Sequence, residues 1–321
     1  MNKKRIIVCT VTVAFSTGFL LLNFLAYNHA HNMLNFTDES QHNQKPLFQI
    51  KNKKLQNLFF GSENPRPITN IKISEEKPLA QEITIRCSNG VTLSAWHINC
   101  LQSDKLVILF HGYGKERSSL LTEAEAFHDL GLSSLLVDFR GSGASSEAYT
   151  SIGYFEAEDV LETVRYTQKN LRYTTTILFG QSMGATAILK ALHDEKIAVN
   201  GIILEGVFDT LLNTVKNRFN IMGVPSFPNA ELLVLWGSIQ MGFNGFAHNP
   251  VEYSKHIDTP ALVMHGTDDP KALLKGAEEV FSQLQGPKKF KKFLNAKHEA
   301  YTERYPTEWK LSVKDFLTTI N

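Results

Sequence analysis

The sequence predicts an α/β fold in which helices cover both faces of a mostly parallel central sheet. Short, continuous apolar segments, typical of strands buried on both faces, alternate with longer segments of helical periodicity. In addition, the strand-like run at residues 177–179 ends in a Gly-x-Ser-x-Gly pattern at residues 180–184, and helix-prone residues follow at once. This order of elements is typical of a doubly covered parallel sheet.

Residues 1–28 are expected to form a membrane anchor. Three basic residues at positions 3–5 precede an uncharged apolar stretch over residues 6–27, and about 20 such residues suffice to cross a bilayer. The stretch is longer than a usual signal-peptide core, and Ala26 and Ala30 offer a poor cleavage site. We therefore expect an uncleaved signal anchor with a cytosolic N-terminus and the rest of the chain outside the cytosol. A cleaved signal and a secreted protein are the alternative.

Residues 29–78 are polar and punctuated by proline, which predicts a linker or a loosely draped arm. The chain of 321 residues carries 33 basic and 32 acidic residues. This balance gives no basic footprint for nucleic acid. The spacing of His, Cys and Asp suggests no metal site, and no cofactor is expected.

A single domain over residues 79–321 accounts for all the predicted elements. Residues 81–86 and 91–98 flank Asn89-Gly90 and predict a hairpin. In such a hairpin Cys87 and Cys100 lie too far apart along the strands for a disulfide. Further strands are expected at residues 105–110, 134–138, 201–205, 261–265 and 289–294, and helices at 120–130, 155–169, 185–193 and 307–319.

A long insertion at about residues 207–259 is expected to form a short helical cap. It is longer than a crossover between neighbouring strands requires. Its large apolar residues are Phe208, Phe219, Met222, Phe227, Trp236, Met241, Phe243 and Phe246. We expect either an extra pair of helices at the sheet edge or a lid over the active site whose apolar underside receives an acyl chain.

Ser182 is the candidate nucleophile. A sharp strand-to-helix turn holds a serine in sparsely allowed backbone angles, and its neighbours Gly180 and Gly184 are small enough to avoid the helix that follows. An ordinary serine in a glycine-rich turn is the alternative.

From about residue 79 to the C-terminus the chain resembles the α/β-hydrolase fold serine hydrolases, and among them the membrane-anchored Bem46-like hydrolases. The resemblance rests on His111-Gly112-Tyr113-Gly114, Val137-Asp138-Phe139-Arg140-Gly141-Ser142-Gly143, the turn at Ser182, Ile203-Leu204-Glu205-Gly206, Asn249-Pro250-Val251-Glu252-Tyr253-Ser254 and His265-Gly266-Thr267-Asp268-Asp269. It implies an α/β-hydrolase fold with serine chemistry and leaves the substrate open.

A serine nucleophile needs a histidine base and a carboxylate that orients it, in the chain order Ser, acid, His on this fold. The family pattern His-Gly-x-x-Asp selects Asp269 over Asp268. The candidate bases are His193, His248, His256, His265 and His298. His298 alone follows the last strand, where the fold needs it.

The resemblance assigns the oxyanion-binding amides to Tyr113 and Met183, and it gives His111, Asp138 and Arg140 structural roles in their loops. The function expected is a membrane-anchored serine hydrolase that cleaves a carboxylic ester or thioester through an acyl-enzyme. The expected substrate is a small molecule with an acyl group, and a lipid-like ester such as a monoacylglycerol or a lysophospholipid is one candidate. Acyl transfer to another acceptor and a non-catalytic scaffold of the same fold are the alternatives.

Overall fold

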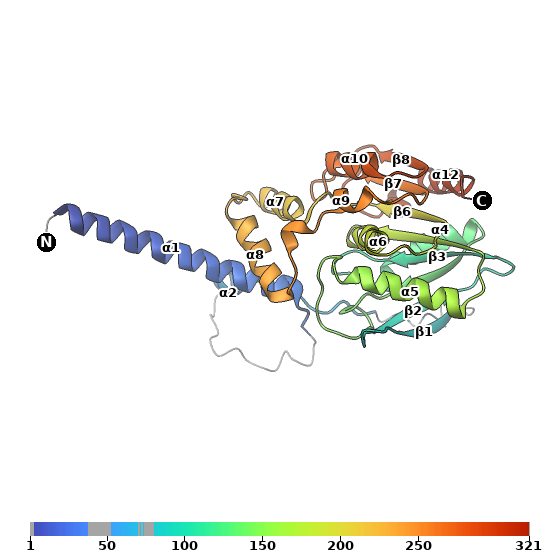
Figure 1. Cartoon of the computed structure of the whole chain (residues 1–321), viewed down its shortest axis with the longest axis horizontal. Coiled ribbons are helices and arrows are strands. Elements are labelled where there is room, and N and C mark those ends of the chain that lie inside the picture. The colour runs from blue at the N-terminus through green and yellow to red at the C-terminus, as the bar shows by residue number, and fades with distance from the viewer. Residues whose placement is uncertain (1–2, 38–52, 70, 72, 74–79, 321) are drawn as a thin grey trace.

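The computed structural model describes residues 3–37, 53–69, 71, 73 and 80–320 (Figure 1). Its centre is an 8-stranded sheet in the order β1-β2-β4-β3-β5-β6-β7-β8. The strands are β1 (Ala80–Arg86), β2 (Thr92–Ile98), β3 (Lys105–Phe110), β4 (Ser133–Val137), β5 (Thr175–Gln181), β6 (Gly201–Glu205), β7 (Ala261–Gly266) and β8 (Lys288–Phe293).

The sheet is parallel from β4 to β8 and antiparallel at the edge formed by β1 and β2. Leu109 of β3 lies beside Leu136 of β4 on one side and Phe179 of β5 on the other. The chain goes from β3 to β4 and then returns past β3 to β5. In an open α/β sheet, a reversal of this kind leaves a crevice beyond the carboxyl ends of the strands.

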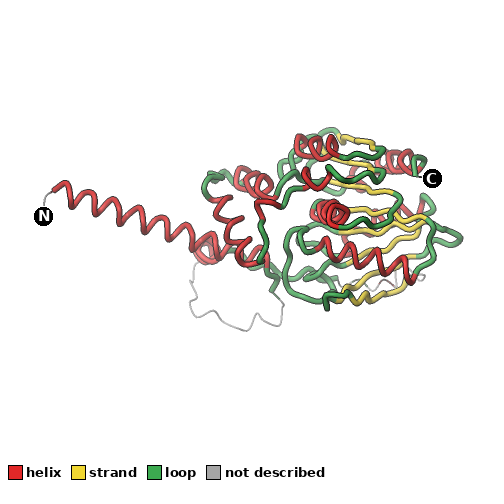
Figure 2. Tube along the Cα trace, viewed as in Figure 1, coloured by secondary structure: helices red, strands yellow, loops and turns green. Residues whose placement is uncertain are grey.

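Helices cover both faces of the sheet, as predicted (Figure 2). One core includes side chains from α5 (Glu156–Asn170), α6 (Met183–Asp194), α9 (Pro250–Ser254) and α10 (Leu274–Gln283). The core on the other face includes side chains from α4 (Leu121–Asp129) and α12 (Pro306–Leu317), and α11 (Tyr301–Arg304) lies beside α12. A 3₁₀ turn, η2 (Arg117–Leu120), precedes α4. Cys87 and Cys100 are free thiols.

The insertion after β6 contains α7 (Leu211–Ile221), α8 (Asn229–Met241) and the turn η3 (Gly245–Ala247). These elements share a small apolar core of their own. Figure 1 shows α7 and α8 at the end of the body from which α1 projects. The elements α7, α8 and η3 therefore form a separate helical cap, whereas α9, which also lies within the residues 207–259 expected for the insertion, packs into the body through Tyr253.

The N-terminal helix α1 spans Lys3–Leu34 and is apolar enough over residues 7–34 to cross a membrane. It continues past residue 28, where the anchor was expected to end, because its last turns pack against α8 and the helix α2 (Lys53–Phe60). Tertiary contacts thus order part of the segment 29–78 that polarity alone predicts as a linker. Residues 38–52, 70, 72 and 74–79 of that segment lie outside the described residues.

Candidate active site

Ser182 lies at the turn between β5 and α6, with φ 53° and ψ −108°. Positive φ in a residue with a Cβ is strained by about 1–3 kcal/mol and persists where the surroundings impose it. The surroundings do so here through close packing. A Cβ on Gly180 would lie 2.5 Å from the amide nitrogen of Ala185, and one on Gly184 would lie 2.2 Å from the carbonyl oxygen of Phe110. Both glycines are therefore required by contacts with backbone.

The structure brings the three expected side chains into one hydrogen-bonded row. The Oγ atom of Ser182 lies 3.0 Å from Nε2 of His298, and Nδ1 of His298 lies 2.6 Å from Oδ2 of Asp269. Ser182 follows β5, Asp269 follows β7 and His298 follows β8. The three strands run parallel, so their carboxyl ends deliver these residues to the same edge of the sheet.

Asp269 is buried and kept ionised by its partners. Burial alone would raise its pKa, but the hydrogen bond and charge of His298, together with the backbone N–H of Ala272, lower the pKa below its usual value. Its second oxygen, Oδ1, accepts hydrogen bonds from the amides of Lys271 at 2.9 Å and Ala272 at 3.0 Å. These two bonds fix the carboxylate plane and direct Oδ2 toward His298.

Asp268, the alternative acid, lies on the exposed side of the same turn. Its carboxylate accepts a hydrogen bond from the neighbouring Thr267 hydroxyl at 3.1 Å. The hydrogen bond to His298 belongs to Asp269 instead.

The other candidate histidines have other partners. His248 is buried between the Tyr253 hydroxyl and the carbonyl oxygen of Ile152. His193 packs its ring against Tyr253 and His256. His265 is buried under the acid, with Nε2 2.8 Å from the Ala272 carbonyl oxygen and 3.7 Å from the Asp269 carboxylate. Of the five, only His298 is within hydrogen-bond reach of Ser182.

The two amides expected to bind an oxyanion flank Ser182. Met183 is the first residue of α6, and Gly112 and Tyr113 line the same cavity as Ser182. Across the described residues, the amide N–H groups of Tyr113 and Met183 make no hydrogen bond. The amide of Ser182 itself donates to the Glu205 carbonyl oxygen at 2.7 Å. Free donors at a helix N-terminus suit a developing negative charge.

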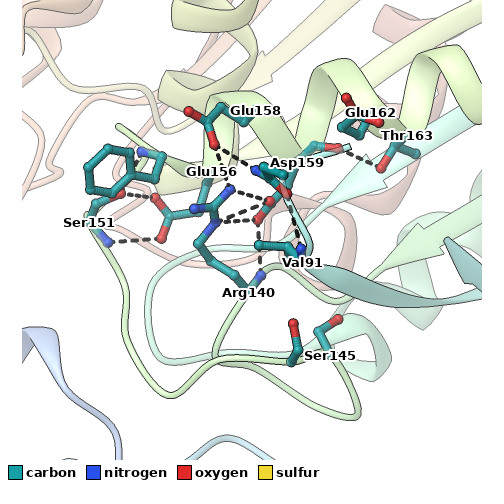
Figure 3. Close-up of polar contacts among 12 residues, drawn as sticks. Val91, Arg140, Ser145, Ser151, Glu156, Glu158, Asp159, Glu162 and Thr163 are labelled. Carbon is teal, nitrogen blue, oxygen red and sulfur yellow. Dashed lines mark hydrogen bonds and ion pairs between the residues drawn. The ribbon is translucent and has the colours of Figure 1, made fainter. Parts of the chain in front are cut away.

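His111 and the loop after β4 support the site from behind. Nε2 of His111 accepts from the Phe139 amide at 3.1 Å. Burial lowers the pKa of His111 to about 4, so the ring is neutral at pH 7. Figure 3 shows Arg140 beside Asp159, to which its Nη2 donates at 2.7 Å.

The same loop reaches the first turn of α6. Glu156 accepts hydrogen bonds from the Thr150 hydroxyl and the Gly153 amide, and Gly153 packs against Met183 and Thr186. Gly153 of this loop therefore packs against the first turn of α6, the helix that follows Ser182, while Arg140 pairs with Asp159 of α5.

A cavity of about 530 Å³ opens on Ser182 and His298. Most of its lining is polar or charged: Lys115, Ser119, Gln181, Glu205, Arg218, Lys271, Glu299 and Glu303. The cap contributes Arg218 from α7, and none of the eight large apolar cap residues named above lines this cavity. The apolar underside expected to receive an acyl chain is therefore not part of this cavity.

Arg218 is a half-buried cation in this cavity. Burial lowers its pKa, while the nearby Tyr113 hydroxyl and Asp269 carboxylate partly oppose that effect. No carboxylate in the described part of the chain lies within ion-pair distance of its guanidinium. A cation in this position is available to an acidic group on a bound molecule.

Glu205 lies at the floor of the cavity and has a raised pKa. Burial and the nearby Glu123 carboxyl raise its pKa to about 8, against the hydrogen bonds that Gln181 and Trp309 donate to it. Neither Glu205 nor Arg218 was singled out as a site residue from the sequence, because no local pattern shows that residues 205 and 218 share a cavity with residue 182. The motif containing Glu205 was the only available signal.

The comparisons with known proteins agree with this architecture. Residues 102–213 match the Hydrolase_4 family model, described as serine aminopeptidase S33. The solved structure of the esterase Pf2001 from Pyrococcus furiosus superposes with a TM-score of 0.68 at 23% identity, covering 80% of this chain and 97% of that one. The chain has the α/β-hydrolase fold. The narrower resemblance to Bem46-like hydrolases stays a prediction.

Two relatives each match more than half of this chain. The uncharacterized protein YqkD of Bacillus subtilis is 24% identical over 239 residues, 72% of this chain and 77% of that protein. The lysophosphatidylserine lipase ABHD12 of Macaca fascicularis is 24% identical over 204 residues. That match covers 62% of this chain and half, 50%, of the lipase.

Proposed function

We propose that this α/β-hydrolase is a serine hydrolase that cleaves carboxylic esters or thioesters through an acyl-enzyme. The observation that carries the proposal is the row of hydrogen bonds from Ser182 through His298 to Asp269. The esterase and lipase relatives support an ester hydrolase in general.

In the proposed reaction, Nε2 of His298 takes the hydroxyl proton of Ser182 while Oγ attacks the substrate carbonyl carbon. The amides of Tyr113 and Met183 bind the resulting oxyanion, and each such donor contributes about 3–4 kcal/mol. His298 then gives its proton to the leaving alcohol or thiol. A water molecule, deprotonated by the same nitrogen, releases the acid and restores Ser182. Asp269 stays ionised and stabilises the imidazolium.

A fluorophosphonate probe tests the proposal directly. We expect the folded wild-type chain to be labelled and the Ser182→Ala variant to stay unlabelled. Ser119→Ala, which removes another hydroxyl from the same cavity, is the matched control and should keep the label. A folded wild-type chain that does not react would favour the non-catalytic scaffold.

Product analysis separates the remaining alternatives. Hydrolysis releases the free acid, whereas an acyltransferase forms a new ester or amide when alcohols or amines are added. Because the matched family is described as a serine aminopeptidase, an aminoacyl arylamide is the appropriate competing substrate. Faster turnover of the arylamide than of a matched ester would contradict the ester assignment.

The cavity also favours one lipid-like substrate over another. Among the residues that the structure describes, no carboxylate pairs with Arg218, so a lysophospholipid, whose head group is acidic, fits better than a neutral monoacylglycerol. The name of the ABHD12 relative, a lysophosphatidylserine lipase, supports the same choice. A charge-assisted hydrogen bond contributes about 1.5–3 kcal/mol, which is roughly 10- to 100-fold in binding.

We therefore expect Arg218→Gln to lower kcat/KM for lysophosphatidylserine at least tenfold and to leave kcat/KM for a monoacylglycerol of the same chain length unchanged. Arg165→Gln, which removes an exposed arginine of the body paired with Glu195, is the control. Equal losses for both substrates would refute recognition of an acidic group by Arg218.

We further propose that α1 is an uncleaved anchor with its N-terminus in the cytosol. Its last turns are part of the folded body. The Tyr113 hydroxyl donates to the Met33 carbonyl oxygen at 2.6 Å, and Trp236 Nε1 donates to Asn23 at 3.1 Å. Cleavage near residue 26 or 30 would cut through this packed helix. N-terminal sequencing of the membrane fraction after carbonate extraction tests the proposal, and a mature chain beginning beyond residue 26 would refute it.

A further inference from the structure

The outer surface of the cap carries large apolar side chains that the active site does not use. On the turn between α7 and α8, Met222 is 63% exposed and Phe227 is 75% exposed, and Ile239 on α8 is 59% exposed. Ile221, Val224 and Leu235 are exposed beside them. We call these six residues the cap apolar surface. Exposed patches of this kind mark an interaction surface.

The sequence of α8 shows why one of its faces is left without a partner. Apart from Asn229, Glu231, Ser238 and Gln240, its residues are apolar or glycine on every side of the helix. A helix apolar on every side is normally surrounded by apolar material. Here one side packs into the cap core through Ala230 and Val234, and the next side contacts α1. The third side, with Leu235 and Ile239, is exposed.

Contacts with α1 fix where this surface lies relative to the apolar helix. The ring of Trp236 packs edge-on against Tyr27 at 5.4 Å between centroids, and its Nε1 donates to Asn23. Gln240 on the next turn donates to the Tyr27 carbonyl oxygen at 3.1 Å. The cap therefore begins alongside α1 at about residue 23, a few residues before the apolar stretch of α1 ends at residue 27.

The length of α1 places its contact with the cap, at about residue 23, near the membrane surface. A helix of 32 residues is about 48 Å long at 1.5 Å per residue, whereas the hydrocarbon core of a bilayer is about 30 Å thick. Residues up to about 22 can fill that core, and the side chains of residues 7–22 are exposed in the structure. Trp236 and Tyr27 then lie where aromatic residues concentrate, at the interface between lipid and water.

We propose that the cap apolar surface docks into the interfacial layer of the bilayer that α1 crosses. Figure 1 shows the turn between α7 and α8 at the side of the body facing the free half of α1. The occupant proposed is lipid because α8, which carries part of this surface, packs directly against α1, the helix proposed to cross the bilayer. This inference rests on α1 being the membrane anchor, and it places the opening of the cavity near lipid-borne esters.

If the cap docks in this way, its inner and outer sides have different functions. The inner side contributes Arg218 to the cavity, and the outer side contacts acyl chains of the surrounding bilayer. The exposed apolar residues of the cap are then covered by lipid and do not have to line a substrate pocket. The polar lining of the cavity and the apolar composition of the cap are both explained.

The test uses the full chain in phosphatidylcholine–phosphatidylglycerol nanodiscs, with its three cysteines replaced by serine. An environment-sensitive fluorophore is attached at Phe227→Cys. The control is Leu311→Cys, at a residue that is 60% exposed on α12 of the body. We expect lipids carrying a quencher on the acyl chain to quench the label at 227 and not the label at 311. An aqueous quencher should act in the opposite order.

Three outcomes would overturn the proposal. If the label at 227 is as accessible to the aqueous quencher as the label at 311, the cap surface does not touch lipid although α1 does. If it is shielded from both quenchers and the nanodisc holds two chains, the occupant is a second copy. If the chain fails to enter nanodiscs, the anchor and the docking fail together. None of these readouts depends on catalysis, so the proposed hydrolase activity is tested separately.

A second measurement links the surface to substrate delivery. The double variant Met222→Ser/Phe227→Ser should raise KM at least fivefold for a long-chain ester presented in nanodiscs. It should leave kcat/KM for soluble p-nitrophenyl acetate unchanged, because neither residue lines the cavity. Leu101→Ser/Leu311→Ser, with similarly exposed residues on the body, should change neither value. An equal effect of the two double variants would refute a specific role of the cap.

Discussion

The body of the protein and its cap are stabilised in different ways. The body has two large apolar clusters, one on each face of the sheet, and its strand residues from Leu106 to Phe110 are fully buried. The buried core of the cap consists of Leu211, Val215, Ala230 and Val234. Buried apolar area is the dominant favourable term in folding, so the body can hold its shape alone, while the cap depends on α1 and on its surroundings.

Because of this difference, the proposed catalytic residues and the proposed substrate-selecting residue lie in different regions. The residues proposed for catalysis are fixed by the body, whereas the residue proposed for substrate selection, Arg218, comes from the cap. The helix α1 touches both regions, through Met33 to the Tyr113 loop and through Asn23 to Trp236. The changes below act on one region at a time, from the largest expected effect to the smallest.

Asp269→Asn tests the chemistry of the body without disturbing its packing. An asparagine keeps an oxygen for the amides of Lys271 and Ala272 but presents an amide group to His298, which favours the wrong tautomer of the ring. We expect kcat to fall about 10⁴-fold, as in other serine hydrolases with this change, with little change in Tm. Asp268→Asn is the matched control. A loss of less than tenfold would remove Asp269 from the mechanism.

A glycine-to-alanine substitution should have opposite effects on stability in the body and in the cap. In the body, a Cβ on Gly184 would lie 2.2 Å from a backbone oxygen, so Gly184→Ala should cost at least about 4 kcal/mol and abolish activity. In the cap, the nearest atom to a Cβ on Gly237 is the flexible end of Leu34, at 3.2 Å. Gly237→Ala should be neutral or raise stability by up to about 1 kcal/mol. Equilibrium unfolding in detergent measures both, and similar values would contradict the comparison.

The buried carboxyl under Ser182 makes the stability of the body depend on pH. The pKa of Glu205 is raised from 4.5 to about 8 in the folded chain, so the folded state retains a proton that the unfolded state releases. Its contribution is favourable below pH 4.5 and is lost as the pH rises toward 8, by at most about 1.4 kcal/mol per pH unit. Glu205→Gln should flatten the fall of Tm between pH 5 and 8. Glu303→Gln, at an exposed carboxylate of the same cavity, should leave the slope unchanged.

Tryptophan-to-phenylalanine changes give the smallest effect and compare the two regions again. Trp236→Phe removes the hydrogen bond from the cap to Asn23, worth about 1 kcal/mol, and should increase amide exchange in α8 without lowering the Tm of the body. Trp309→Phe removes the bond to Glu205 from a fully buried site and should lower the global Tm instead. If both variants unfold the whole chain to the same extent, the cap is not a separate unit.

Local pattern predicted most of the sheet and the nucleophile. The continuous apolar runs identified the parallel strands because full burial on both faces leaves no polar alternation. The pattern around Ser182 was informative because a strand-to-helix turn needs small residues on both sides of the serine: Gly180 lies against the backbone of Gly184 and Ala185, and Gly184 lies against Phe110 of β3. The family pattern selected Asp269, and the position after the last strand selected His298. The structure brings both side chains to Ser182. The roles of all three residues await the experiments above.

Tertiary structure alone decided which residues share the cavity and where the cap faces. Arg218 and Glu205 reach Ser182 because the chain folds back through a crossover and a cap, and no spacing along the sequence encodes that approach. The apolar residues of the cap predicted contact with apolar material but not which way these side chains would face. Their direction depends on the packing of α8 against α1, a contact between residues more than 200 positions apart. Short-range chemistry therefore fixed the elements and the nucleophile, and long-range packing fixed the pocket and the outer surface.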